Sequence, residues 1–207
     1  MSAERLVHGK VELALHALRP GAGRAAELPL LLLHGLGERS PQALPEELAP
    51  WPGPVFALDF TGHGESSVPC GGGYTAELLM GDADTALRHL GQATLLGRGL
   101  GAYVALLLAG ARPEPVQGAI LCDGLGLAGG GGEPASPSVV ELPLREPEAP
   151  DPFALAELSR DLRPADYASV FVRQALELSG RERPLSVCCA ERPAWLRAVA
   201  VAPGVAL

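Results

Sequence analysis

Two histidines and two serines carry the residue types of nucleophilic catalysis, in which a histidine activates a serine hydroxyl. His34 and His63 each follow a short apolar segment, and Ser66 and Ser67 come shortly after His63. Loops at the carboxyl ends of parallel strands are where open α/β sheets bind ligands. We nevertheless expect His63 to brace its own turn through a backbone hydrogen bond rather than to activate either serine.

Cysteines and one acidic residue offer a second set of reactive groups. Cys122 ends an apolar segment and precedes Asp123, while Cys188 and Cys189 are adjacent. We expect Cys122 to be an inert core residue. Successive residues of a strand point to opposite faces, so Cys188 and Cys189 are poor joint ligands. The sequence therefore predicts no metal site and no cofactor.

Composition indicates one compact domain. The 207 residues are 47% hydrophobic and only 19% charged, which allows a core to form without disulfides or a metal. The net charge is −8, and Lys10 is the only lysine, so no nucleic-acid-binding patch is expected.

Neither a signal peptide nor an apolar run long enough to span a membrane is recognisable. We expect a reduced, cytoplasmic protein without membrane association, and its scarcity of lysine suggests a GC-rich bacterial genome.

The elements that position these residues follow from apolar patterning. Alternation over residues 6–18 predicts one or two half-exposed strands at a sheet edge. Five short apolar segments predict strands covered on both faces; they read LPLLLLHG, VFALDF, ATLLG, VQGAILCDG and PLSVCCA.

Helical patterns fall between these strands. Residues 40–48 predict a short helix. Thr75 is suited to cap an amphipathic helix that Gly91 ends, and AYVALLLAGA predicts a buried helix. Alternating strands and helices indicate an α/β fold, with a mostly parallel central sheet and helices on both faces.

Composition changes at Gly129, after the core of residues 1–128. Residues 129–183 predict a linker and a small helical, cap-like insertion, with helices over 152–162 and 164–178. Residues 184–207 form the terminal strand region, in which VAVAPGVAL starts a last strand.

Three motifs in order make the chain resemble the α/β-hydrolase superfamily. LLLLHGLGE, residues 30–38, is a strand followed by His-Gly, and LDFTGHGES, residues 58–66, contains the family's D-x-x-G-x-G-x-S turn. LLGRGLGAYVAL, residues 95–106, lies where the family carries G-x-S-x-G. The resemblance extends over roughly residues 6–123 and implies an α/β-hydrolase-like fold.

The resemblance also marks a departure from the family's chemistry, because Gly99 stands at the position of its serine nucleophile. Glycine has no side chain that attacks a carbonyl, and it adopts a positive φ without strain. Pro193 stands where the acid is expected, with Glu191 a weak substitute. Asp123 lies where some members carry a relocated acid, although a turn or cap role is the preferred interpretation. The family's late catalytic histidine has no counterpart after His89.

A ligand site is a further implication of the resemblance. The backbone N–H of Leu36, just after His34 and Gly35, would be one oxyanion donor, and that of Leu100 the second. Arg98 would hold an anionic ligand or remain solvated. We therefore expect a small-molecule carbonyl or anionic ligand at these residues.

Three hypotheses for function remain open. The first is a non-catalytic small-molecule binding or interaction protein that lacks the Ser-His-Asp triad. The second is an active hydrolase of ester or related acyl bonds with a non-standard site, in which His63 activates water. The third is a truncated copy whose missing tail exposes apolar sheet surface, which predicts a homodimer.

Overall fold

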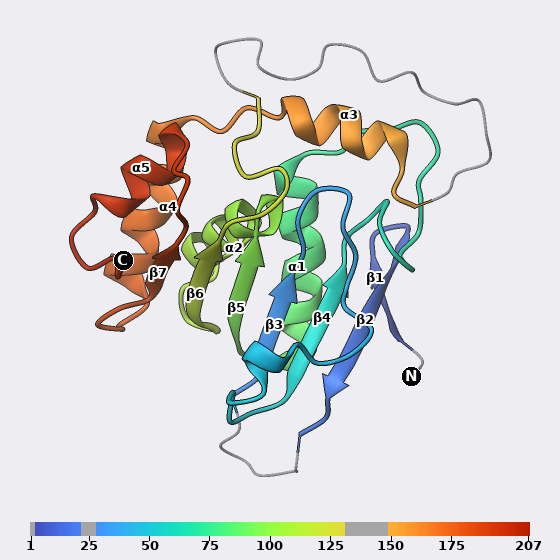
Figure 1. The fold of residues 1–207 in the computed structure, drawn as a ribbon, viewed down its shortest axis with the longest axis horizontal. Coiled ribbons are helices and arrows are strands. Elements are labelled where there is room, and N and C mark those ends of the chain that lie inside the picture. The colour runs from blue at the N-terminus through green and yellow to red at the C-terminus, as the bar shows by residue number, and fades with distance from the viewer. Residues whose placement is uncertain (1–2, 22–27, 131–148) are drawn as a thin grey trace.

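The described residues form a seven-stranded sheet in the order β1-β2-β4-β3-β5-β6-β7 (Figure 1). This computed structural model describes residues 3–21, 28–130 and 149–207. β2 pairs antiparallel with β1 and β4, and all other neighbours are parallel. The strands are β1 (Glu4–His8), β2 (Val11–Arg19), β3 (Leu30–Leu33), β4 (Val55–Asp59), β5 (Ala93–Arg98), β6 (Val116–Cys122) and β7 (Leu185–Cys188). The predicted α/β fold with a mostly parallel sheet is confirmed, as is the strand pair at its edge.

Five α-helices and one 3-10 helix accompany the sheet in the described part of the chain. They are η1 (Glu46–Leu48), α1 (Ala76–Leu90), α2 (Leu100–Ala111), α3 (Pro152–Arg160), α4 (Ala165–Leu178) and α5 (Ala194–Ala200). The Thr75 hydroxyl accepts a hydrogen bond from the amide of Leu78, and Gly91 ends α1 with a φ of 79°. Both predicted boundaries of this helix are confirmed. None of the described helices has the length and apolar character needed to cross a bilayer.

The two faces of the sheet are covered differently. α1, α2 and α4 lie behind the sheet in Figure 1 and pack with it into the larger core cluster. On the other face, η1 and the loop around it cover a smaller cluster. That cluster consists of Leu18, Leu30, Leu32, Val55 and Ala57, with Leu44, Leu48, Trp51 and Leu96 packed against it.

Two sequence predictions need correction. The helix expected over residues 40–48 is confined to η1, because Pro41 and Pro45 lack an amide hydrogen and disfavour helical geometry in the residue before them. The last strand expected from VAVAPGVAL is wrong for its first residues, since α5 continues to Ala200. Only Ala206 pairs with the sheet, through an isolated parallel bridge to Ser186.

The region predicted as an insertion supplies part of the main core. The two helices expected there are present, although α3 ends at Arg160, and residues 131–148 lie outside the described part of the chain. α4 packs against α2 and α5, with Ala168, Val172 and Ala175 buried. α3 instead crosses the end of the molecule at which β3, β4 and β5 end (Figure 1).

Candidate functional site

The turn between β5 and α2 centres on Gly99, whose φ of 56° and ψ of −118° are strained for residues with a side chain and unstrained for glycine. A Cβ atom on Gly99 would lie 2.0 Å from the carbonyl oxygen of Leu125 and 2.6 Å from the carbonyl carbon of Gly124. Both atoms belong to the backbone, so they can yield only if the whole segment moves. The backbone conformation therefore favours glycine here, and the lack of space for a Cβ atom requires it.

The two expected oxyanion donors converge on a single acceptor. The amides of Leu36 and Leu100 donate to the carbonyl oxygen of Leu125, at 3.0 and 2.9 Å. In the described structure this main-chain oxygen lies where the resemblance places the oxygen of a ligand. We call residues 123–127, which carry it, the plug loop.

Two buried side chains hold the plug loop in place through hydrogen bonds to its carbonyl oxygens. The guanidinium of Arg163 donates to the carbonyl oxygens of Gly126 and Leu127, the latter at 2.7 Å, and the indole of Trp195 donates to Leu127 at 2.9 Å. Arg163 also lies 5.0 Å from the ring centre of Tyr103, within cation–π range. Burial lowers the pKa of Arg163 to about 10, which leaves it charged at neutral pH.

Asp123, the first residue of the plug loop, joins two strand ends. One of its carboxylate oxygens accepts a hydrogen bond at 2.7 Å from the amide of Ala190, just beyond β7. The other oxygen is buried without a hydrogen-bond partner among the described residues. Glu191 is exposed, and Pro193 precedes the first turn of α5. The described contacts of Asp123 are those of a turn-closing residue.

His63 is completely buried, and both of its ring nitrogens are engaged. Nδ1 donates to the carbonyl oxygen of Thr61 at 3.1 Å, and Nε2 accepts from the amide of Gly37 at 3.2 Å. Burial lowers the pKa of His63, so the ring is neutral at pH 7. The expected backbone bracing by His63 is confirmed.

His34 is held in the same manner, with its ring centre 5.1 Å from that of His63. Its Nδ1 donates to the carbonyl oxygen of Gly35 at 2.7 Å, and its Nε2 accepts from the amide of Phe60 at 3.1 Å. Burial and the neighbouring His63 lower the pKa of His34 to about 4. Neither histidine retains a nitrogen lone pair for use as a base.

The serine hydroxyls are likewise bound to the backbone. Ser66 Oγ donates to the carbonyl oxygen of Asp59 at 2.6 Å and accepts from the amide of Ala14 at 2.9 Å. Ser67 Oγ accepts from the amide of Glu12 at 3.1 Å. These bonds attach the turn after β4 to β2, which makes both serines structural.

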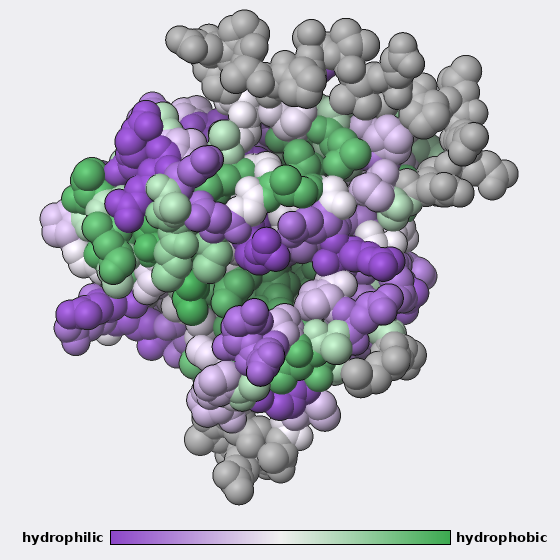
Figure 2. Space-filling model, in the orientation of Figure 1, coloured by the Kyte–Doolittle hydropathy of each residue, from purple (hydrophilic) through white to green (hydrophobic). Residues whose placement is uncertain are grey.

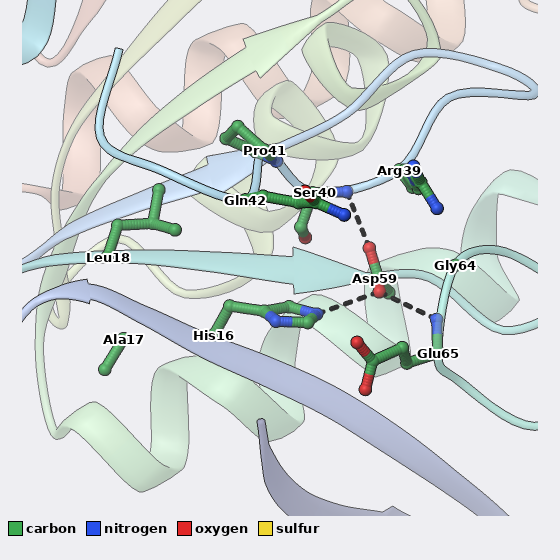
Figure 3. A pocket seen from close by; sticks show the side chains of 10 residues that line it. All are labelled: His16, Ala17, Leu18, Arg39, Ser40, Pro41, Gln42, Asp59, Gly64 and Glu65. Atoms are coloured by element: carbon green, nitrogen blue, oxygen red, sulfur yellow. Dashed lines mark hydrogen bonds and ion pairs between the residues drawn. The ribbon is translucent and has the colours of Figure 1, made fainter. Parts of the chain in front are cut away.

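Asp59, to which no role was assigned from the sequence, organises this region. Its carboxylate accepts from the amides of Ser40 and Glu65, at 2.6 and 2.8 Å, and from Nε2 of His16 at 2.9 Å (Figure 3). Burial raises the pKa of Asp59, but these hydrogen bonds outweigh it and hold the pKa below its usual value. A Cβ atom on Gly64 would lie 2.2 Å from the carboxyl carbon, so glycine permits this approach. Asp59 is the first residue of the D-x-x-G-x-G-x-S motif, and this position was the sequence signal that pointed to a role for it.

A pocket of about 500 Å³ lies beside the plugged turn, between the sheet and the loop that carries η1. Figure 2 shows apolar atoms at the bottom of a hollow over β3 and β5, with hydrophilic residues on its rim. Leu32, Leu48 and Leu96 line the pocket, together with Arg98 and Glu38. The Arg98 guanidinium lies 3.8 Å from the Glu38 carboxylate.

The structure thus divides the predicted ligand-binding residues into two groups. His34 and Arg98 line the pocket. The amides of Leu36 and Leu100 face the plug loop instead, and a Cβ atom on Gly35 would lie 2.9 Å from the carbonyl oxygen of Leu125. Among the described residues, no group of three or more His, Cys, Asp or Glu side chains is placed to hold a metal ion.

Known structures provide three comparisons. A hydrolase from Pseudomonas aeruginosa is 27% identical, with a TM-score of 0.49 over 63% of this chain and 48% of its own. The enol-lactonase from Burkholderia xenovorans is 25% identical, with a TM-score of 0.49 over 57% of this chain and 46% of its own. A thioesterase domain from the curacin biosynthetic pathway is 26% identical, with a TM-score of 0.51 over 59% of this chain and 44% of its own.

The matched region spans less than half the length of each of these structures. Curated proteins gave no match. Residues 30–206 match the model of the alpha/beta hydrolase family, which is most of the chain. This protein therefore belongs to the alpha/beta hydrolase family.

Proposed function

We propose that this protein is a non-catalytic member of its family and acts by binding a small molecule or a partner rather than by hydrolysis. One observation carries the proposal: the Leu125 carbonyl oxygen engages the amides of Leu36 and Leu100 and fills the space beside Gly99. In a serine hydrolase that space holds the nucleophile, and those donors stabilise the oxyanion.

The surrounding side chains support the same proposal. A general base needs a nitrogen or carboxylate with a free lone pair within reach of a proton. Both ring nitrogens of His34 and of His63 are used by the backbone, and the Asp59 carboxylate is held by two backbone amides and the ring of His16. These contacts stabilise loops and turns, which explains the presence of family motifs without a role in catalysis.

The proposed ligand is a small molecule with an apolar body and one anionic group. The pocket beside the plugged turn offers an apolar floor that includes Leu32 and Leu96. Arg98 at its rim is more than half exposed, with its guanidinium beside Glu38. The anionic group of the ligand would replace Glu38 as the partner of Arg98. The Arg98–Glu38 ion pair is long and exposed, so it contributes little to stability.

Hydrolysis of short and medium p-nitrophenyl esters tests the proposal. Wild type, Gly99→Ser and His63→Ala are all expected to match the uncatalysed rate, since a serine at position 99 would collide with Leu125. Circular dichroism of each variant verifies folding. Turnover by wild type that His63→Ala abolishes would overturn the proposal in favour of a hydrolase with a rebuilt site.

A cytoplasmic location and a homodimer remain predictions. Cell fractionation tests the first. Size-exclusion chromatography with light scattering tests the second, and a stable monomer would contradict it.

A further inference from the structure

Three side chains form a row across the carboxyl ends of neighbouring strands. Arg98, Cys122 and Cys188 are the last residues of β5, β6 and β7. Arg98 pairs in register with Cys122, and Cys122 with Cys188. In-register neighbours of a parallel sheet point to the same face, so the two thiols and the guanidinium lie side by side.

The row belongs to the face of the sheet opposite α2 and α4. Leu121 and Val187, one residue earlier in each strand, are buried in the larger core cluster with those helices. Because side chains alternate along a strand, Cys122 and Cys188 point the other way. Cys188 is exposed and Cys122 is only half-buried, which corrects the expectation that Cys122 lies in the core.

Cys189 has a different environment from this pair. It is 5% exposed, and its Sγ donates to the carbonyl oxygen of Leu121 at 3.2 Å. Burial raises the pKa of Cys189 to about 12, so its thiol remains protonated at neutral pH. Cys122 and Cys188 are therefore the two neighbouring thiols that are both accessible to solvent.

The spacing of paired strands suits a disulfide between these two positions. Neighbouring strands lie about 4.8 Å apart, and disulfides join Cα atoms separated by about 4.4–6.8 Å. Both cysteines end their strands, so the small approach required of their Cβ atoms disturbs few ladder hydrogen bonds. Burial raises the pKa of Cys122, and the neighbouring Arg98 guanidinium opposes this shift. The thiolate is the attacking species in thiol–disulfide exchange.

We propose that Cys122 and Cys188 form a redox-active dithiol site that reacts with a low-molecular-weight disulfide and closes to an intramolecular disulfide. The exposed Cys188 thiolate attacks one sulfur of the small disulfide, whose S–S bond breaks as the first small thiolate leaves. The Cys122 thiolate then attacks Cys188 Sγ and releases the second. Two protein thiols are oxidised, the small disulfide is reduced to two thiols, and the two protons pass to the departing thiolates.

Closure of this bond would act on the plug loop, which begins directly after Cys122. The carbonyl oxygen of Cys122 accepts a hydrogen bond at 3.0 Å from the amide of Gly99, and Asp123 is bound to Ala190 beyond β7. A covalent link between β6 and β7 would reinforce this bridge. The inference does not depend on the proposed non-catalytic function.

Oxidation in glutathione redox buffers of increasing disulfide fraction tests the proposal on the 207-residue protein. Free thiols are alkylated in denaturant at each step, so that the buried Cys189 also reacts, and intact mass and peptide mapping locate the oxidised cysteines. The expected product has lost two hydrogen atoms and joins Cys122 to Cys188, while Cys70 and Cys189 are alkylated. Dithiothreitol is expected to reverse the change completely.

Variants assign the bond, because Cys188 and Cys189 fall in the same peptide. Cys189→Ser is the matched control and is expected to retain the full loss of two hydrogens. Cys122→Ser is expected to stop at a glutathione adduct on Cys188, and Cys188→Ser to form no internal disulfide. A persistent glutathione adduct on Cys188 in wild type, a Cys188–Cys189 bond or a disulfide between two chains would each overturn the proposal.

Discussion

The carbonyl oxygen of Leu125 lies 2.0 Å from the place that a Cβ atom on Gly99 would occupy, and it accepts the amides of Leu36 and Leu100. One main-chain oxygen thus occupies the space beside Gly99 and accepts hydrogen bonds from both amides. Buried amides without partners are costly, so the plug loop stabilises a turn that would otherwise need a ligand or water.

Gly99→Ala tests the requirement for glycine. The substitution is expected to lower the free energy of unfolding by about 3 kcal/mol, because strain at positive φ adds to a backbone collision. Gly9→Ala is the matched control, since Gly9 has a φ of 61° with nothing within 4 Å of its Cβ position; its expected loss is about 1 kcal/mol. Urea unfolding measures both, and equal losses would show that the collision is absent.

Trp195→Phe tests the fastening of the plug loop. Loss of the indole hydrogen bond to Leu127, together with the smaller volume of phenylalanine in the core, is expected to reduce stability by about 2 kcal/mol and to accelerate hydrogen exchange at the amides of Leu36 and Leu100. Trp51→Phe is the matched control, because the Trp51 indole donates to the carbonyl oxygen of Leu28 at 3.0 Å, away from the plug loop. Similar acceleration of hydrogen exchange at Leu36 and Leu100 in both variants would show that the effect does not come from the hydrogen bond to the plug loop.

The pH dependence of stability tests the state of His34. Its pKa falls from 6.5 in the unfolded chain to about 4 in the fold, so the unfolded chain binds more protons between these values. The stabilising contribution of the neutral, buried His34 ring is fully present above pH 6.5 and is lost as the pH falls toward 4. The stability lost by His34→Gln should therefore shrink from about pH 7 to about pH 5, by an amount on the order of 1–2 kcal/mol. Chemical unfolding at each pH provides the measurement; a constant difference would mean that His34 is not buried and neutral.

Binding of anilinonaphthalene sulfonate, an apolar anionic dye, tests the pocket beside the plugged turn. Arg98→Gln is expected to weaken binding about threefold to tenfold, which corresponds to about 1 kcal/mol. Arg88→Gln is the control, because this exposed arginine on α1 is remote from the residues that line the pocket. Fluorescence titration gives the dissociation constants. Equal affinities in wild type and both variants would show that Arg98 does not contribute to binding of the dye.

Much of the fold was predictable because its signals are local. The apolar segments of β3 to β6 appear directly in the sequence, and Thr75 and Gly91 mark the ends of α1 through the chemistry of capping. The bracing role of His63 was also foreseeable, since its turn requires backbone hydrogen bonds that a nearby imidazole supplies.

The family motifs, the absence of a side chain at Gly99 and the order of strands and helices along the chain can all be read from the amino-acid sequence. The position of the Leu125 carbonyl group beside Gly99 cannot, because every residue has the same carbonyl group and the contact joins three segments distant in sequence. The tertiary structure likewise decided the exposure of Cys122, since the side of β6 that is buried depends on where α2 and α4 pack. A local pattern specifies what an element is, whereas contacts between distant backbone groups exist only once the elements have assembled.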